Sequence, residues 1–304
     1  MARCLSGLTQ RCQRLPRAVR GRPRPLVARS STSRGGAEAS SKDPTAPCSV
    51  EHVGYFRSCF SCRNGCPRQG SLAPNSVGVV ELRQGHEVFE APAGLSLTGL
   101  EGFSHAWLLW HFSEYQSRKM RSPRVRPPRL GGESLGVFAC RSPKRPSRIG
   151  MTACRIEGVS EEGAWLRVSG VDLLDGTPIL DIKPYVPRYD SFPGATVPAW
   201  MDRPSEALGH RSGVAAADVE VRFEPRALEE LESVSRRSGL FRDSAAMEGT
   251  IAQVLSQDPR SRTSKKHDKQ EYGFRLDNAR VTCVFRRVSR DGLEALVTRV
   301  EAAE

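Results

Sequence analysis

Positive charge is concentrated in one short stretch of the sequence that also holds two prolines. Residues 141–148 read RSPKRPSR, so four of these eight residues are cations. Proline lowers the entropy cost of holding a loop in one geometry, and the planar guanidinium group of arginine suits carboxylate and phosphate groups. The stretch could therefore bind an anionic ligand. The alternative is an ordinary solvated loop, because loop charges are usually unpaired.

Residues 172–185 form a second stretch, in which acids interleave with an apolar run. The sequence DLLDGTPILDIKPY places Asp175 and Gly176 at a turn and Asp181 inside the run that follows. Polar residues around turns are placed where chemistry is often found, because loops carry many binding and catalytic groups. The alternative for Asp175 and Gly176 is a plain turn.

Three cysteines, Cys59, Cys62 and Cys66, have a C-x2-C-x3-C spacing that a metal site could use. Tetrahedral zinc needs four ligands, and the sequence offers no second CxxC pair and no HxxxH pair. We therefore expect no metal and a loop with reduced thiols; a metal-dependent scaffold is the alternative. The G-x-G-x-x-G pattern is also absent, so a Rossmann cofactor site is not indicated.

The positive charge of the chain lies mainly in its first residues. The formal net charge is +12, but the first 37 residues hold nine arginines and no acid, which leaves +3 for the rest. A composition rich in Arg, Ser, Gly and Pro predicts a disordered basic tail over residues 1–49. We expect a cytoplasmic protein. Because the same composition is typical of a mitochondrial transit peptide, a mitochondrial location is the alternative.

Short strands are the elements that must position these stretches. Strand-like runs separated by turns and Pro/Arg loops cover residues 53–56, 77–82, 106–112, 135–140, 151–159, 164–168 and 179–182. Many short strands with almost no long helix predict a small β-barrel over residues 50–191. None of these runs is long enough to cross a membrane, so we expect no membrane partner.

The character of the sequence changes after the predicted barrel. Residues 192–217 are rich in Pro, Gly and Ala without periodicity, which indicates a linker. Residues 218–304 predict a small α+β domain. Its expected elements are helices opening at Pro225 and over 244–256, and strands at 219–223, 272–276, 281–288 and 295–300. The predicted fold class is therefore mainly β, a small β-barrel followed by a small α+β C-terminal domain.

Six strings that occur in one order resemble the motifs of a known family. They are PRQ at 67–69, LEGFSHAW at 100–107, RPPRL at 126–130, GVFACRSPKRP at 136–146, IG at 149–150 and DGTPILDIKPY at 175–185. Together they are similar to the TsaA-like (TrmO) family of tRNA (adenine-N6)-methyltransferases, over residues 50–190. The C-terminal module, including QDPR at 257–260, resembles the second domain of that family.

The resemblance implies a β-barrel methyltransferase that works as a homodimer and binds S-adenosylmethionine (SAM) outside any Rossmann fold. The family methylates the exocyclic amine of threonylcarbamoyl-adenosine, next to the anticodon (position 37) of threonine tRNA. The alternative is a non-catalytic tRNA- or SAM-binding module of the same fold. The cofactor contacts implied for this sequence are Pro67, Arg68, Gln69, Ser113, Glu114, Arg141, Met151, Leu174, Asp175, Gly176 and Thr177.

One of these contacts departs from the family pattern. After Phe112 the family usually has a histidine where this sequence has Ser113, and a histidine stands instead at His111. Glu114 could still hydrogen-bond the ribose hydroxyls of SAM, and His111 could be an ordinary strand residue.

The implied reaction needs a proton acceptor. In the threonylcarbamoyl base the reacting nitrogen belongs to a urea-like group, whose proton a nearby carboxylate could accept. We expect Asp181 to be this acceptor, because it lies beside the turn that the family uses for its cofactor. Asp172 is the second candidate. The alternative for Asp181 is structural, an interaction that orders Lys183 or a turn amide.

The implied tRNA needs cations for its phosphates and flat groups for its unstacked bases. Tyr185 and Tyr189 are candidate stacking platforms, with core packing as the alternative. Basic residues between Arg260 and Lys269 could also reach tRNA, or could form a solvated loop. The cations expected to bind tRNA are Arg124, Arg126, Arg129, Lys144, Arg145 and Arg148.

Overall fold

The computed structural model describes residues 50–84, 89, 91–115, 122–127, 130, 132–202, 219–260, 264–266, 271–289 and 292–303. The predicted basic tail, residues 1–49, lies outside the described residues, and so does the greater part of the predicted linker. Of the helices within these ranges, none is long and apolar enough to cross a membrane.

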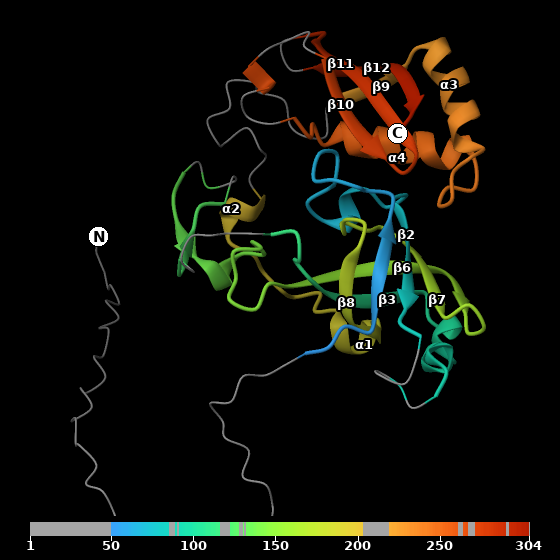
Figure 1. Ribbon diagram of the computed structural model, residues 1–304. Coiled ribbons are helices and arrows are strands. Elements are labelled where there is room, and N and C mark those ends of the chain that lie inside the picture. The colour runs from blue at the N-terminus through green and yellow to red at the C-terminus, as the bar shows by residue number, and fades with distance from the viewer. Residues whose placement is uncertain are drawn as a thin grey trace, which may run out of the picture. The chain divides into compact units, whose positions relative to one another are not determined.

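Six strands close into a barrel, which confirms the predicted fold class (Figure 1). Their order is β1-β2-β7-β6-β3-β8, and every neighbouring pair is antiparallel. Closure removes the unpaired edges that an open sheet would leave. The strands are β1 Gly54–Ser58, β2 Val77–Leu82, β3 His105–His111, β6 Ile149–Ser160, β7 Trp165–Ser169 and β8 Thr177–Pro184.

Alternating side chains fill the interior of the barrel. In β3, Ala106, Leu108 and Trp110 are buried, and the residues between them are more exposed. In β6, Thr152 is buried and the preceding Met151 is exposed. Successive side chains of a strand point to opposite faces, so Thr152 faces inward and Met151 faces outward.

Antiparallel closure brings three connections to the same end of the barrel. Residues 59–76 join β1 to β2, residues 112–148 join β3 to β6, and residues 170–176 join β7 to β8. Residues 83–104 and 161–164 connect strands at the other end. The short helices outside the strands are η1 Gly70–Leu72, η2 Ala93–Leu97, η3 Leu100–Gly102, α1 Pro187–Asp190 and α2 Ala199–Asp202.

The prediction of a strand at 135–140 is wrong beyond its first two residues. The stretch and its partner form three short elements, β4 Arg124–Val125, β5 Leu135–Gly136 and the 3-10 helix η5 Val137–Ala139. The guanidinium group of Arg145 donates to the carbonyl oxygens of Val137 and Cys140. These carbonyls are therefore engaged by a side chain rather than by a neighbouring strand.

The C-terminal domain is one sheet, in the order β10-β11-β12-β9, with two helices (Figure 1). Neighbouring strands are antiparallel except β12 and β9, which are parallel. Pro225 stands in the first turn of α3, where a missing N–H group costs nothing. Asp243 caps α4, because its Oδ1 atom accepts from the Ala246 N–H at 2.8 Å. The elements are β9 Val219–Phe223, α3 Pro225–Ser235, α4 Ser244–Ser256, η7 Ser264–Lys266, β10 Glu271–Leu276, β11 Ala279–Arg287 and β12 Leu293–Ala302.

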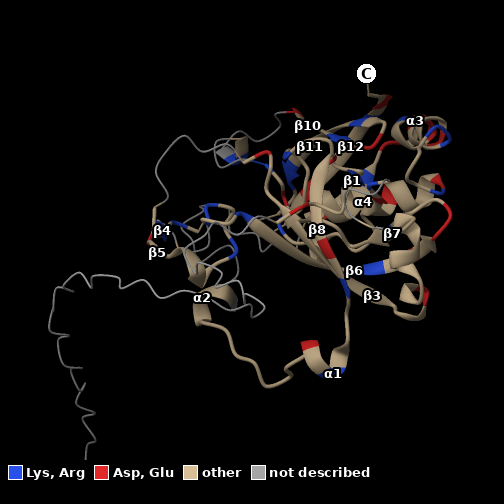
Figure 2. Cartoon of the chain, turned by 60° about the horizontal axis from the view of Figure 1, so that its bottom comes forward, with Lys and Arg blue, Asp and Glu red and all other residues tan. Residues whose placement is uncertain are grey.

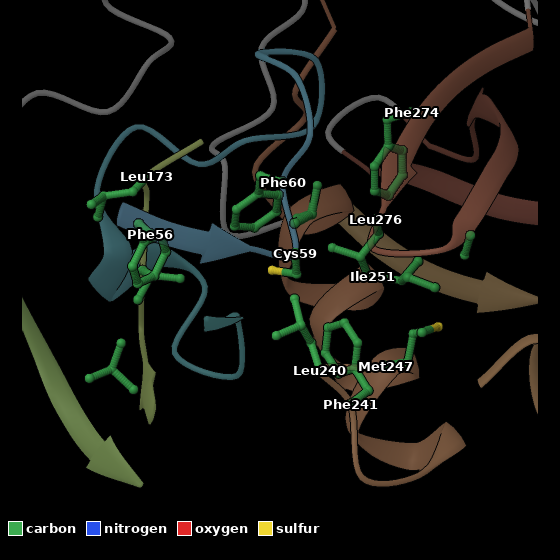
Figure 3. Packing of buried hydrophobic residues seen from close by; sticks show 14 of the residues in the cluster. Phe56, Cys59, Phe60, Leu173, Leu240, Phe241, Met247, Ile251, Phe274 and Leu276 are labelled. Atoms are coloured by element: carbon green, nitrogen blue, oxygen red, sulfur yellow. The ribbon is translucent and has the colours of Figure 1, made fainter. Parts of the chain in front are cut away.

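The barrel and the C-terminal domain share one hydrophobic core. Cys59 and Phe60, which follow β1 directly, are fully buried. Figure 3 shows them between Phe56 and Leu173 of the barrel and C-terminal side chains such as Leu276. The connection from β1 to β2 is therefore packed between the two domains.

Candidate active site

The segments predicted to contact the cofactor come together at one end of the barrel. This is the end that carries the connections 59–76, 112–148 and 170–176. Residues 67–69 lie in the first connection, residues 113, 114 and 141 in the second, and residues 174–176 in the third. Met151 and Thr177 lie next to them, near the beginnings of strands β6 and β8. The topology thus collects motifs that are up to 110 residues apart in the sequence.

Two of these segments touch directly. Gln69 Oε1 accepts a hydrogen bond from Arg141 Nη1 at 2.9 Å. Gln69 Nε2 donates to the carbonyl oxygen of Arg68 at 2.6 Å, which fixes the amide within its own loop. The PRQ loop and the cationic stretch are therefore in direct contact.

Asp172 lies at the same end and is connected to the barrel interior. Thr152 Oγ1 donates to Asp172 Oδ1 at 2.6 Å, and Trp110 Nε1 donates to Thr152 Oγ1 at 3.2 Å. Burial raises the pKa of Asp172 to about 6, while the Thr152 hydrogen bond and the positive charge of Arg141 oppose that rise. A carboxyl group with such a pKa can exchange a proton near neutral pH.

The Asp-Gly-Thr turn is held against the end of β1. Asp175 Oδ1 accepts from the Ser58 N–H at 2.9 Å, and the Gly176 N–H donates to the Phe56 carbonyl at 2.8 Å. Gly176 has a φ of +72°, a conformation that glycine adopts without strain. Thr177 Oγ1 donates a hydrogen bond to the Leu174 carbonyl at 2.6 Å, which closes the turn. The turn residues fix the loop shape through these contacts.

The segment after β3 lies beside the cationic stretch. The Phe112 N–H donates to the Arg148 carbonyl at 2.9 Å, and Arg63 Nη2 donates to the Glu114 carbonyl at 2.5 Å. Ser113 donates its N–H to the carbonyl of His111 at 2.8 Å. His111 itself pairs with Ile149 in the sheet, as an ordinary strand residue would.

Asp181 lies on the outer face of the barrel, opposite Leu109 of β3. Its Oδ2 atom is 2.7 Å from Lys183 Nζ, and its Oδ1 atom accepts from the Ile182 N–H at 2.8 Å. The carboxylate therefore orders Lys183 and a backbone amide, as the structural alternative predicted. Asp172, the second candidate, is the acid that lies near Arg141.

Several of the cations expected to bind tRNA have structural partners. Figure 2 shows Lys and Arg along the loops beside β4 and β5. Arg124 is hydrogen-bonded to Ser134, and the guanidinium of Arg145 lies over the Phe138 ring at 5.5 Å. Arg129 lies outside the described residues. Arg145 and Arg124 thus help to shape these loops, in addition to any role with RNA.

The two tyrosines proposed for base stacking differ in their surroundings. Tyr185 packs against Trp107, with ring centroids 5.5 Å apart, and against His105. Tyr189 is 70% exposed. Tyr189 is therefore the freer platform for a base.

The C-terminal basic run is partly used inside its own domain. Arg260 is buried, bound to Asp258 at 2.8 Å and stacked on Phe285 at 3.9 Å. Lys265 is 3.1 Å from the same Asp258. Arg262 and Lys269 lie outside the described residues.

The cysteine cluster forms no metal centre in the part of the chain that the structure describes. The cysteines within the described ranges are all free. Burial raises the pKa of Cys59 and of Cys66 above the ordinary thiol value. Both thiols therefore stay protonated at neutral pH.

Comparison with protein families identifies the fold and its motifs. The model of the tRNA-methyltransferase O N-terminal domain matches residues 55–191, and the model of the TrmO C-terminal domain matches residues 216–301. The chain belongs to the TrmO family. The first match covers the barrel with the three connections described above, and the second covers the C-terminal domain.

Individual relatives of the TrmO family agree with this assignment. A putative S-adenosylmethionine-dependent methyltransferase, RcsF of Pseudomonas aeruginosa, is 41% identical over 232 residues, which is 75% of this chain and 88% of the relative. The tRNA (adenine(37)-N6)-methyltransferase of Escherichia coli K12 is 34% identical over 216 residues, which cover 69% of this chain and 81% of the relative. That of Homo sapiens is 43% identical over 169 residues, and only 37% of its length is matched.

Solved structures of TrmO share the architecture. One crystal structure of TrmO superposes with a TM-score of 0.63 at 33% identity, covering 84% of this chain and all of the other. The crystal structure of TrmO from P. aeruginosa gives a TM-score of 0.62 at 32% identity, and the match covers 85% of this chain and 98% of the other.

Sequence reasoning missed two groups of residues at this site. Thr152 holds the Asp172 carboxylate and Trp110 holds Thr152, and only the inward positions of these two residues in their strands could have pointed to them. Asn64 and Tyr272, whose contact is described below, are 208 residues apart. No local pattern in the sequence could have paired them.

Proposed function

We propose that this member of the TrmO family methylates the exocyclic amine of threonylcarbamoyl-adenosine at position 37 of threonine tRNA. The coarser function is that of the family: the chain is a SAM-dependent tRNA (adenine-N6)-methyltransferase. The observation that supports the proposal is the meeting of Gln69, Arg141 and the partly buried Asp172 at one barrel end, where a methyl donor and an amine could be held together. The motifs that resemble the family converge at this same end.

The residues at this end suit the chemical groups of SAM. The Arg141 guanidinium can pair with a carboxylate, and Gln69 holds it toward the PRQ loop. Acidic groups suit the amine and the ribose hydroxyls, and the Glu114 carbonyl accepts from Arg63 of the connection that also carries the PRQ loop. When bound, SAM supplies a methyl group that its sulfonium already activates.

The chain itself must orient the amine and accept its proton. We assign the acceptor role to Asp172 in place of Asp181. Thr152 donates to Oδ1 of Asp172 and so fixes the orientation of the carboxylate. Burial raises the pKa of Asp172 to about 6, so the group is ionised at pH 7.5 and is a stronger base than an exposed aspartate.

Labelled methyl transfer tests the proposed substrate. Purified protein is incubated with tritium-labelled SAM and either native threonine tRNA or an unmodified transcript of the same sequence. We expect label in the native tRNA alone, because the urea-like nitrogen of the modified base has the more acidic proton. Equal labelling of the transcript would contradict the proposed base, and binding without transfer would indicate a non-catalytic module.

We further propose that the protein acts as a homodimer. The outer face of β3 and β6 offers an apolar surface for a second copy, because Ile149 and Met151 are exposed there beside the half-buried Leu109. Sedimentation equilibrium of the purified protein tests this proposal. A monomer at the concentrations used for activity would overturn it.

A further inference from the structure

The connection from β1 to β2, residues 59–76, carries the PRQ loop in its middle and is held by the C-terminal domain on both sides of that loop. At its start, the Asp277 N–H donates to the Cys59 carbonyl at 2.7 Å. Cys59 and Phe60 are buried among C-terminal side chains (Figure 3). This beginning of the connection is therefore fixed by the second domain.

The contact nearest to the PRQ loop is made by Asn64. Tyr272 Oη of β10 donates to Asn64 Oδ1 at 2.7 Å, and Asn64 Nδ2 donates to the Gly273 carbonyl at 2.5 Å. Burial raises the pKa of Tyr272 further above its ordinary value, so the hydroxyl keeps the proton that it donates. The next residue, Gly65, has a φ of +84°, and a Cβ atom there would lie 2.5 Å from the Phe274 ring. The backbone of the loop thus lies directly against β10.

A second contact holds the chain after the PRQ loop. The Asn75 N–H donates to Gln253 Oε1 at 2.8 Å, and Thr250 Oγ1 donates to the Asn75 carbonyl at 2.9 Å. Both partners belong to α4 of the C-terminal domain. The segment between Asn64 and Asn75, with residues 67–69 inside it, is therefore tied at both ends to the same domain.

The same connection reaches the other parts of the site. Arg63, the neighbour of Asn64, donates to the Glu114 carbonyl at 2.5 Å, and its guanidinium lies 5.9 Å from the centre of the Tyr115 ring. Cys66 Sγ donates to the Asp172 carbonyl at 3.5 Å. The connection that Asn64 holds is therefore in contact with both other connections at this end of the barrel.

We propose that the C-terminal domain sets the affinity for SAM by holding the PRQ loop in its binding geometry, with Tyr272 and Asn64 as positioning residues. The inference rests on the proposed placement of SAM at residues 67–69. A loop that is already ordered loses less entropy when a ligand binds, so its affinity is higher. The contact thus acts on binding and leaves the chemical step unchanged.

Removal of one hydroxyl group tests this role. Tyr272→Phe keeps the ring contacts with Phe274 and Phe285 and deletes the hydrogen bonds that the hydroxyl makes with Asn64 and with the backbone of Gly65, both in the connection from β1 to β2. By isothermal titration calorimetry we expect the dissociation constant for SAM to rise about three- to ten-fold, because the loop loses hydrogen bonds that hold it in its binding geometry. The kcat at saturating SAM and the KM for tRNA should keep their wild-type values.

Thr298→Val is the matched control. Thr298 Oγ1 donates to the Thr282 carbonyl inside the same sheet, away from the connection. The control removes a hydroxyl from the same domain and should leave SAM binding unchanged. Asn64→Ala should also weaken SAM binding, and the double variant should lose less affinity than the sum of the two single losses, because both changes remove the hydrogen bond between Tyr272 and Asn64.

A third variant separates failure of this inference from failure of the proposed site. Gln69→Ala should weaken SAM binding if residues 67–69 contact the cofactor. Unchanged SAM binding by Gln69→Ala would overturn the placement and the inference together. If Gln69→Ala weakens SAM binding but Tyr272→Phe and Asn64→Ala bind SAM with wild-type affinity, the inference alone is overturned. A lower melting temperature of Tyr272→Phe without a change in its affinity for SAM would overturn it too.

Discussion

The carboxylate of Asp172 is the residue on which the proposed chemistry depends. Its Oδ1 atom is held by Thr152, whereas the Asp181 carboxylate is occupied by Lys183 on the outer face. We expect Asp172→Asn to lower the single-turnover rate by about 100-fold or more, because an amide cannot accept the proton. Asp181→Asn is the matched control and should stay near the wild-type rate; the opposite ranking would return the acceptor role to Asp181.

The titration of Asp172 also gives a pH dependence. Burial raises its pKa from 3.8 to about 6, so the folded state holds the proton more tightly than the unfolded state. The stability that this proton contributes is present below pH 3.8 and is lost as the pH rises through 6. Asp172→Asn lacks this titration. The free energy of unfolding is measured by urea denaturation at pH 4 and pH 7. Between these two pH values, that of the wild type should fall by up to about 3 kcal/mol relative to that of the variant. If the difference in free energy between the two proteins is the same at both pH values, the pKa is not raised.

The activity of the wild type should follow the same group. As the pH rises through 6, Asp172 becomes ionised and can accept a proton, so the single-turnover rate should rise and then level off. A rate independent of pH between 5 and 8 would contradict the assignment.

At the scale of the element, strand β6 couples barrel packing to the site. A Cβ atom on Gly150 would lie 2.3 Å from the indole ring of Trp110, which holds Thr152 through Nε1. Gly150→Ala should therefore lower the free energy of unfolding by about 1–3 kcal/mol, as overpacking does. Gly158→Ala in the same strand is the control, since its Cβ would meet Trp165 at an ordinary 3.6 Å. Equal unfolding midpoints in urea for the two variants would contradict this reasoning.

The strands were largely predictable because apolar and polar residues alternate along a strand wherever only one face of the sheet is buried. The run at 77–82 has the observed bounds of β2, and the helix over 244–256 has those of α4. The run at 135–140 has the same β-rich composition but fails as a strand, because the Arg145 side chain takes two of its carbonyls. That competition comes from the tertiary structure, which local propensity does not contain.

The candidate site was predictable only as a set of motifs. Their order in the sequence indicated a common family, and the barrel topology then brought Gln69 to Arg141, 72 residues away. The relative roles of Asp172 and Asp181 could not be ranked from sequence, because they depend on burial and partners. The inward position of Thr152, opposite the outward Met151, decides which acid is held at the barrel end.

For the whole molecule, the distribution of charge governs the interaction with RNA. The formal charge of +12 includes nine arginines within the first 37 residues. Binding of tRNA should release counterions, so we expect its affinity to fall more than about ten-fold between 50 and 200 mM salt. Binding of SAM, a small ligand, serves as the control and should change little. A tRNA dissociation constant that does not depend on salt would contradict a phosphate-dominated interface.

The burial of Cys59 and Phe60 in a core common to both domains has a consequence for how substitutions are tolerated. A residue such as Leu276, remote in sequence from every motif of the barrel, lies in the same core cluster as the two side chains that begin the loop of the catalytic end. Core substitutions in the last third of the chain should therefore weaken SAM binding as well as lower stability, and the two domains should melt as a single cooperative unit.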